Sequence, residues 1–172
     1  AIAIMRLLWA GGPAPVSFHG LHYRLEGARP GPLPDRRIGI WLGALKPRML
    51  QLTGRQADGW SISYNWCPPE QVPALRAVLE AAAAEAGRPA GAIRRNYNLM
   101  GLIASDGQPN VRVRQGMVGG PPASWAELIA RCVDELGMDS FIYWPVAGDV
   151  RTQIRLWVEQ VVPAARRLVG GA

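Results

Sequence analysis

The sequence predicts an α/β fold with a parallel central sheet. Four segments of strand character follow one another, each succeeded by a helical segment, and parallel neighbours need crossover connections of this kind. The first of them, Ile38 to Leu42, is a continuous apolar run, which is typical of a strand buried on both faces. A (β/α)-barrel and a doubly wound sheet both fit, although no GxGxxG follows any strand, which weakens a nucleotide-binding reading.

Before Ile38 the chain lacks this alternation of strand and helix. Residues 1–9 predict the last turns of a helix that ends at Gly11. Residues 16–26 alternate around Gly20, which predicts a short β-hairpin or a bent strand, and a Pro- and Gly-rich loop follows.

Local signals define the four strand-and-helix units. Ser124 and Glu127 form a capping box, Gly87 and Gly137 are placed to end helices, and Pro163 is expected to kink the last one. We predict strands at residues 38–42, 59–64, 96–104 and 140–144, helices at 47–56, 68–87, 124–137 and from 150 onward, and a loop at 105–122. The apolar face predicted for the last helix consists of Ile154, Trp157, Val158, Val161 and Val162.

The number of units suggests an incomplete barrel. A complete eight-stranded barrel takes about 250 residues, whereas this chain has 172. The chain also begins without Met and inside a helical pattern. We therefore expect a single partial domain, residues 1–172, that forms the C-terminal half of a (β/α)8 TIM barrel and carries strands five to eight.

Composition excludes several classes of partner. The net charge is +6, but the arginines are scattered instead of forming the stripe of a nucleic-acid face. No apolar run reaches the roughly 18 residues of a membrane span. Cys67 and Cys132 have no metal-ligand spacing, and His19 and His22 point to opposite faces of a strand, so we expect no metal. Unpaired cysteines favour a reducing, cytoplasmic location.

The stretch from Ile38 to Trp60 carries the clearest functional signal. A strand runs into the turn Gly43-Ala44 and then into a helix opened by Pro47. Free N–H groups and the positive end of the helix dipole meet at such a turn, which suits a phosphate. The alternative is that Gly43 only allows tight packing of the strand against the helix.

Motifs along the chain resemble the bacterial luciferase-like monooxygenases, a family that includes flavin- and coenzyme F420-dependent oxidoreductases. The resemblance rests on Phe18–Tyr23, Ile40–Ala44 with Pro47–Leu50, Ala57–Trp60, Glu85–Arg88, and the terminal Val161–Arg166. It implies a TIM barrel, F420 or FMN as cofactor, and a cofactor phosphate near the turn after strand five. The matching residues are Leu42, Gly43, Ala44, Lys46, Pro47 and Arg48, although the family often has glycine where this chain has Lys46.

Other strand ends supply candidates for a cofactor or substrate wall. Tyr64, Trp66 and Trp144 have rings that suit stacking against a flat ligand, or else they close the core. Ser105-Asp106 lies at a further strand end. The catalytic residues are unknown, because no proton-transfer constellation is present and the resemblance implies that acid or base groups lie in the missing half.

Two classes of function compete. The first is an oxidoreductase that uses F420 or reduced FMN for hydride transfer or monooxygenation of a small organic substrate, the segment alone being inactive. The second is a non-catalytic half-barrel, a binding or structural protein completed by forming a homodimer, since open edge strands favour association.

Overall fold

The computed structural model describes residues 1–12, 14–89, 91–105 and 112–170. The chain divides into two compact units, residues 1–40 and residues 41–172. The first unit contains helix α1 (Ile2–Ala10) and the antiparallel strands β1 (Val16–His19) and β2 (Arg24–Ala28), in which Phe18 pairs with Leu25. No residue of α1 is buried.

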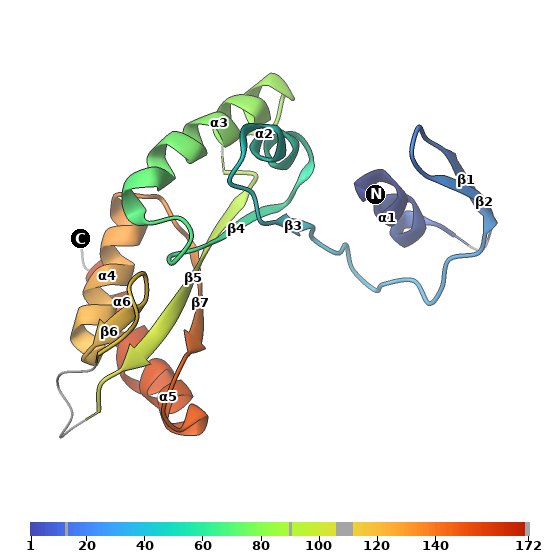
Figure 1. The fold of residues 1–172 in the computed structure, drawn as a ribbon. Helices are drawn as coiled ribbons and strands as arrows, with labels where there is room; N and C mark the ends of the chain where they lie inside the picture. The colour runs from blue at the N-terminus through green and yellow to red at the C-terminus, as the bar shows by residue number, and fades with distance from the viewer. Residues whose placement is uncertain (13, 90, 106–111, 171–172) are drawn as a thin grey trace. The chain divides into compact units, whose positions relative to one another are not determined.

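The second unit is built on a parallel sheet (Figure 1). Its strands are β3 (Trp41–Leu42), β4 (Gly59–Ser63), β5 (Arg94–Ile103), β6 (Val118–Gly120) and β7 (Ser140–Pro145). Strand β3 pairs with β4, and β5 pairs with β4, β6 and β7. Each of these pairings is parallel. The predicted α/β fold with a parallel sheet is thereby confirmed.

Strand β5 is the centre of this sheet. Gly101 pairs with Val118 of β6 and also with Pro145 of β7, so β6 and β7 occupy opposite edges of β5. Strand β4 pairs with residues 94–98 of β5, also on the side opposite β7. β6 therefore pairs with β5 on the same side as β4, further along the strand. The close approach needs glycine, since a Cβ on Gly101 would lie 1.8 Å from the Val118 oxygen.

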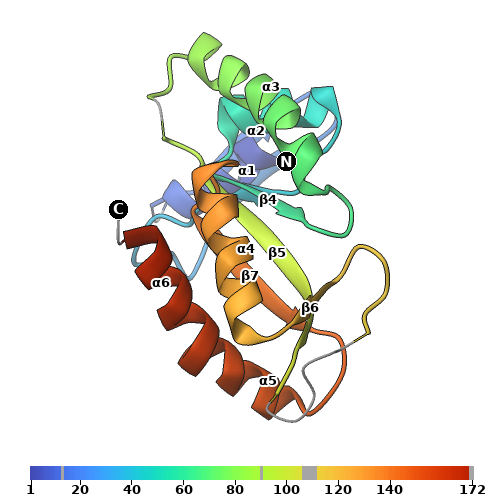
Figure 2. The same ribbon diagram turned by 90° about the vertical axis from the view of Figure 1, so that its left-hand side faces the viewer.

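The helices of this unit cover one face of the sheet (Figure 2). They are α2 (Pro47–Gln56), a 3₁₀ turn (Pro69–Gln71), α3 (Val72–Glu85), α4 (Pro122–Asp134), α5 (Val150–Leu156), a π-helical segment (Trp157–Val161) and α6 (Val162–Gly170). Beneath them the core includes Trp60, Tyr97, Leu99 and Trp125, each with no exposed surface. Along β4, β5 and β7 these buried positions alternate with ones that point to the opposite face.

Helices α2 and α3 pack against each other at Gly54. A Cβ on Gly54 would lie 2.4 Å from the backbone oxygen of Leu79 and 2.8 Å from Cβ of Ala82. The Arg88 guanidinium also donates to the Gly54 oxygen at 2.7 Å. These contacts hold α2, and with it the turn that precedes α2, against the backbone of α3.

Several elements differ from the sequence prediction. The strand predicted at residues 38–42 forms only over Trp41–Leu42, as β3. Trp41 is 43% exposed, so the prediction that this strand is buried on both faces is wrong. The predicted loop at residues 105–122 includes strand β6. With three residues, this strand is too short to show a recognisable strand pattern in the sequence. Helix α4 begins at Pro122 without a side-chain cap, so the capping box at Ser124 is wrong, because proline already suits the first turn.

The last predicted helix is interrupted. The segment Trp157–Val161 forms a π turn immediately before α6, in which Pro163 occupies the first turn. Val161 is fully buried, but Ile154 and Val158 are 42% and 57% exposed, so their place on the apolar face is wrong. Gln153 is buried there instead, at 5% exposure, because its amide finds backbone partners.

The buried thiols predict a pH dependence of stability. Burial raises the pKa of Cys67 from 9.0 to about 11, and burial raises that of Cys132 to the same value. The unfolded thiols ionise first as the pH rises, so this contribution to stability is complete below about pH 9 and is lost toward about pH 11. We expect the free energy of unfolding in urea to fall from about pH 9 to about pH 10, and to fall less when both cysteines are alanine. An equal slope in the double variant would contradict this assignment.

Candidate functional site

The carboxyl ends of the parallel strands meet at one edge of the sheet. Gly43 follows β3, Tyr64 follows β4, Ala104 follows β5 and Val146 follows β7. Helices α2 and α5 begin just beyond β3 and β7 at this edge. In α/β folds ligands bind at this edge, because strand ends and helix N-termini converge there.

The turn between β3 and α2 is held from β4. The indole Nε1 of Trp60 donates a hydrogen bond to the Ala44 oxygen at 2.8 Å, and both residues are buried. Lys46 stands in an extended conformation just before α2, and its oxygen accepts from the N–H groups of Met49 and Leu50. The turn therefore has a defined backbone path from the end of β3 to the first turn of α2.

The N-terminus of α2 has the chemistry of an anion site. No side chain caps it, and its first turn contains no acidic residue. The side chains of Lys46 and Arg48 are exposed beside the positive end of the helix dipole. Gly43 is exposed, and a Cβ there would meet only the Ser61 oxygen, at 3.4 Å, so its backbone is accessible. Of the residues predicted to contact phosphate, only Ala44 is buried, at 3% exposure.

The three aromatic candidates have different surroundings. Tyr64 packs its ring against Tyr97, with ring centroids 5.7 Å apart, and its N–H donates to the Asn98 oxygen. Trp66 is 74% exposed in the turn after β4, and Trp144 is 54% exposed on the helix-free face of β7. Two strands, β4 and β5, separate β7 from β3, so Trp144 is not adjacent to the turn between β3 and α2. Ser105 follows β5, whereas Asp106 lies outside the described residues.

A polar ladder crosses the helix-free face of the sheet. Asn96 Nδ2 donates to Ser61 Oγ at 2.9 Å and to Asn98 Oδ1 at 2.8 Å. Asn98 Nδ2 donates in turn to Ser63 Oγ at 3.1 Å. Asn96 is 1% exposed and its Oδ1 has no hydrogen-bond partner. This ladder was missed from the sequence, although the spacing of two residues in Ser61/Ser63 and Asn96/Asn98 marks one face of each strand.

Gln153 is a second polar residue that sequence reasoning missed. Its side-chain amide accepts from the Ile103 N–H at 2.8 Å and donates to the Ile103 oxygen at 2.9 Å. The Tyr143 hydroxyl lies 2.5 Å from Gln153 Oε1, and burial raises the pKa of Tyr143 to about 12. The sequence offers no signal for this contact, because Gln153 lies in an ordinary amphipathic helical pattern.

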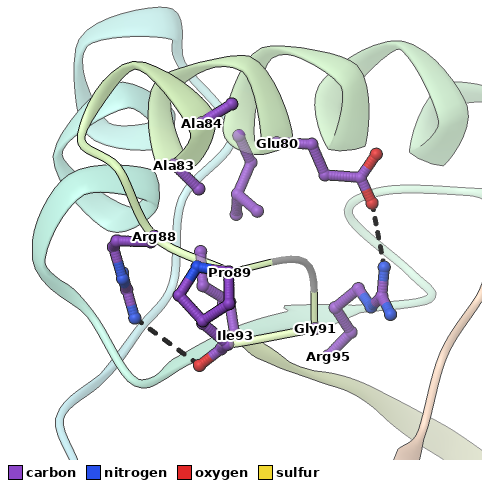
Figure 3. Close-up of a pocket in the computed structure, with 10 residues that line it drawn as sticks. Glu80, Ala83, Ala84, Arg88, Pro89, Gly91, Ile93 and Arg95 are labelled. Carbon is purple, nitrogen blue, oxygen red and sulfur yellow. Dashed lines mark hydrogen bonds and ion pairs between the residues drawn. The ribbon is translucent and has the colours of Figure 1, made fainter.

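A cavity of about 440 Å³ lies at the opposite edge of the sheet, between the end of α3 and the start of β5 (Figure 3). Glu80 and Arg95 form an ion pair of 2.9 Å at its rim, and Arg88 donates to the Ala92 oxygen. Because this is the amino-terminal edge of the strands, the cavity is separate from the turn between β3 and α2.

Among the described residues no group of three or more His, Cys, Asp or Glu side chains is arranged to hold a metal ion. Within the same residues no helix has both the length and the apolar character to cross a bilayer.

The chain is similar to known proteins over most of its length. It is 26% identical over 140 residues to an F420-dependent glucose-6-phosphate dehydrogenase of Nocardia farcinica, a match covering 81% of this chain and 40% of the relative. It is 31% identical over 135 residues to a phthiodiolone/phenolphthiodiolone dimycocerosates ketoreductase of Mycobacterium kansasii, covering 73% and 36%. The chain thus spans about two fifths of the length of these curated relatives.

A solved structure with a similar fold is an F420-dependent secondary alcohol dehydrogenase in complex with an F420-acetone adduct. The TM-score is 0.77 at 18% identity, and the match covers 96% of this chain and 60% of that one. The fold is therefore similar to that of luciferase-like TIM-barrel enzymes. The family model of the luciferase-like monooxygenases matches residues 1–109. The parallel sheet, the turn before α2 and these matches lead to one conclusion: the chain belongs to the luciferase-like monooxygenase family.

Proposed function

We propose that this chain is the C-terminal half of a (β/α)8-barrel oxidoreductase that uses F420 or FMN to act on a small organic substrate. The four strands β3, β4, β5 and β7 correspond in this proposal to barrel strands five to eight of one partial domain. A helix follows each of them directly, except that β6 stands between β5 and α4. The F420-dependent relatives favour F420 over FMN. A non-catalytic half-barrel is not favoured, because the relatives are enzymes.

The observation that carries the proposal is the turn before α2. Its uncapped helix N-terminus, its two cations and the absence of an acid in the first turn fit a phosphate group. We assign the cofactor phosphate to Leu42, Gly43, Ala44, Lys46, Pro47 and Arg48. Pro47 has no N–H to contribute, so its part is to start the helix with the correct backbone angle.

The other residues of the proposed site would position the cofactor and the substrate. When bound, the flavin or deazaflavin supplies the hydride or oxygen chemistry. The Trp60 hydrogen bond holds the turn in place, and the exposed rings of Trp66 and Trp144 offer apolar faces toward a ring or substrate. Tyr64 is half-buried and packs against the core through its contact with Tyr97.

Titration of the full-length protein with F420 and with FMN separately tests the proposal. Calorimetry or quenching of cofactor fluorescence measures each dissociation constant, and we expect saturable binding of one cofactor. Failure to bind either cofactor would overturn the proposal.

A substitution of Lys46 separates binding from stability. Lys46→Asp places a good N-cap residue before α2, so we expect the protein to become more stable by about 1 kcal/mol. The same carboxylate occupies the N–H groups and repels phosphate, so we expect the dissociation constant of the cofactor to rise at least about tenfold. Thermal unfolding and cofactor titration measure the two effects.

Two control variants accompany this change. Lys46→Ala removes the charge without adding a cap, so its loss of affinity should be smaller and its stability unchanged. Arg131→Asp makes the same change of net charge in the last turn of α4, toward the opposite edge of the sheet, and should leave the affinity unchanged. Equal loss of affinity in Lys46→Asp and Arg131→Asp would mean that only net charge matters.

A further inference from the structure

Strand β5 extends two residues beyond its last pair with β7. The last ladder pair between β5 and β7 joins Gly101 to Pro145, and the Val146 N–H then donates to the Gly101 oxygen. Ile103 lies two residues further along β5 and remains paired with Gly120 of β6 on the other edge. Its N–H and oxygen on the β7 side therefore need a partner that β7 does not provide.

Gln153 replaces the missing strand. A primary amide carries one donor and one acceptor side by side, the arrangement that a neighbouring strand would present. Gln153 bonds both the N–H and the oxygen of Ile103, at 2.8 and 2.9 Å, from the first turn and a half of α5. The helix itself is anchored at its start, where Asp149 accepts from the Thr152 N–H at 2.9 Å.

The same amide also contacts β7. The Tyr143 hydroxyl lies 2.5 Å from Gln153 Oε1 and 3.4 Å from the Gly101 oxygen. Tyr143 precedes Trp144, whose ring lies on the other face of the sheet and is assigned to the ligand wall. One buried side chain therefore connects the carboxyl end of β5 to the strand that carries Trp144.

We propose that Gln153 is a positioning residue, which sets the carboxyl end of β5 and Trp144 relative to each other for cofactor binding. It touches no ligand and acts through Ile103 and Tyr143. This inference rests on the proposed function, because Trp144 matters only if a ligand binds at this edge.

Two variants test the role. Gln153→Leu keeps the bulk and removes the hydrogen bonds to Ile103 and to Tyr143, and we expect the dissociation constant of the bound cofactor to rise about tenfold, the scale of a small misplacement. Gln153→Glu tests the hydrogen bonds more specifically than Gln153→Leu does. A protonated carboxyl group reproduces the donor and acceptor, whereas a carboxylate has only acceptors and faces the Ile103 oxygen.

The glutamate variant should therefore depend on pH. Burial and a hydrogen bond from its neutral form raise the pKa of the new carboxyl group, so affinity near that of the unmodified protein is expected at about pH 5 and is lost toward about pH 8. Among the described residues, the ionisable groups near this position include the Tyr143 hydroxyl, Asp149, whose own pKa is lowered by its hydrogen bonds to Thr152, and Arg155 in the last turn of α5. The pH profile of the unmodified protein and of Gln153→Leu serves as reference, and a purely structural role would give no such rescue.

The outcomes are distinct. If the unmodified protein binds neither F420 nor FMN, the proposed function is overturned and this inference with it. If it binds a cofactor while both variants bind equally well at every pH, only the role of Gln153 is overturned. Should Gln153→Leu fail to fold, the glutamate variant decides, since rescue at low pH supports the proposal and a flat profile overturns it.

Discussion

Gly101→Ala is expected to destabilise the protein by about 3 kcal/mol, the upper range for overpacking a core. The new Cβ would lie 1.8 Å from the Val118 oxygen and 2.9 Å from the ring of Trp125. Backbone cannot yield as a flexible side chain does, so β6 has to move away from β5. Urea unfolding followed by circular dichroism measures the loss.

The loss of β6 should be visible locally as well. The Ala104 N–H donates to the Gly120 oxygen at 2.8 Å, and this bond should open when β6 moves, giving faster amide exchange at Ala104. Gly170→Ala is the matched control, because a Cβ there meets nothing within 4 Å. If Gly101→Ala were as stable as this control, the close approach of β6 to β5 would be wrong.

Trp60→Phe is expected to cost about 2 to 3 kcal/mol of stability and to weaken cofactor binding. Phenylalanine fills less of a fully buried site and leaves the Ala44 oxygen without its donor. The proposed phosphate turn then loses the hydrogen bond that joins it to the side chain of Trp60 in β4, so the dissociation constant should rise more than stability alone explains. Unfolding and titration of the same sample separate the two effects.

Trp66→Phe provides the comparison for this change. Trp66 is 74% exposed, so the same substitution there should alter stability by less than about 0.5 kcal/mol. A Trp60→Phe variant that binds cofactor normally in spite of reduced stability would show that the turn does not depend on the indole. The assignment of the phosphate to this turn would then lose its structural support.

The parallel sheet was predictable because its signals are local and repeated. Helix α2 has the predicted bounds Pro47–Gln56, and β5 and β7 differ from prediction by one or two residues at their ends. Strand β6 was not predictable, since three residues depend on the glycine contact at Gly101 and not on a pattern of their own.

The candidate site was predictable only in part. The sequence of the turn at Gly43-Ala44 predicts its backbone form, but the Trp60 hydrogen bond that holds it depends on the neighbouring strand. Gln153 and the polar ladder were missed because their roles arise from tertiary contacts between segments up to fifty residues apart in the chain. A pattern of apolar residues does not report such pairs.

The π segment Trp157–Val161 has a consequence for comparing this chain with its relatives. A π turn contains one residue more than an α turn, so every position after it is rotated by about 100° compared with an uninterrupted helix. Val161 and Ala165 face inward only because of that extra residue. An alignment that runs through this helix without a gap would therefore match the buried positions of α6 with solvent-facing ones in any relative whose helix is continuous.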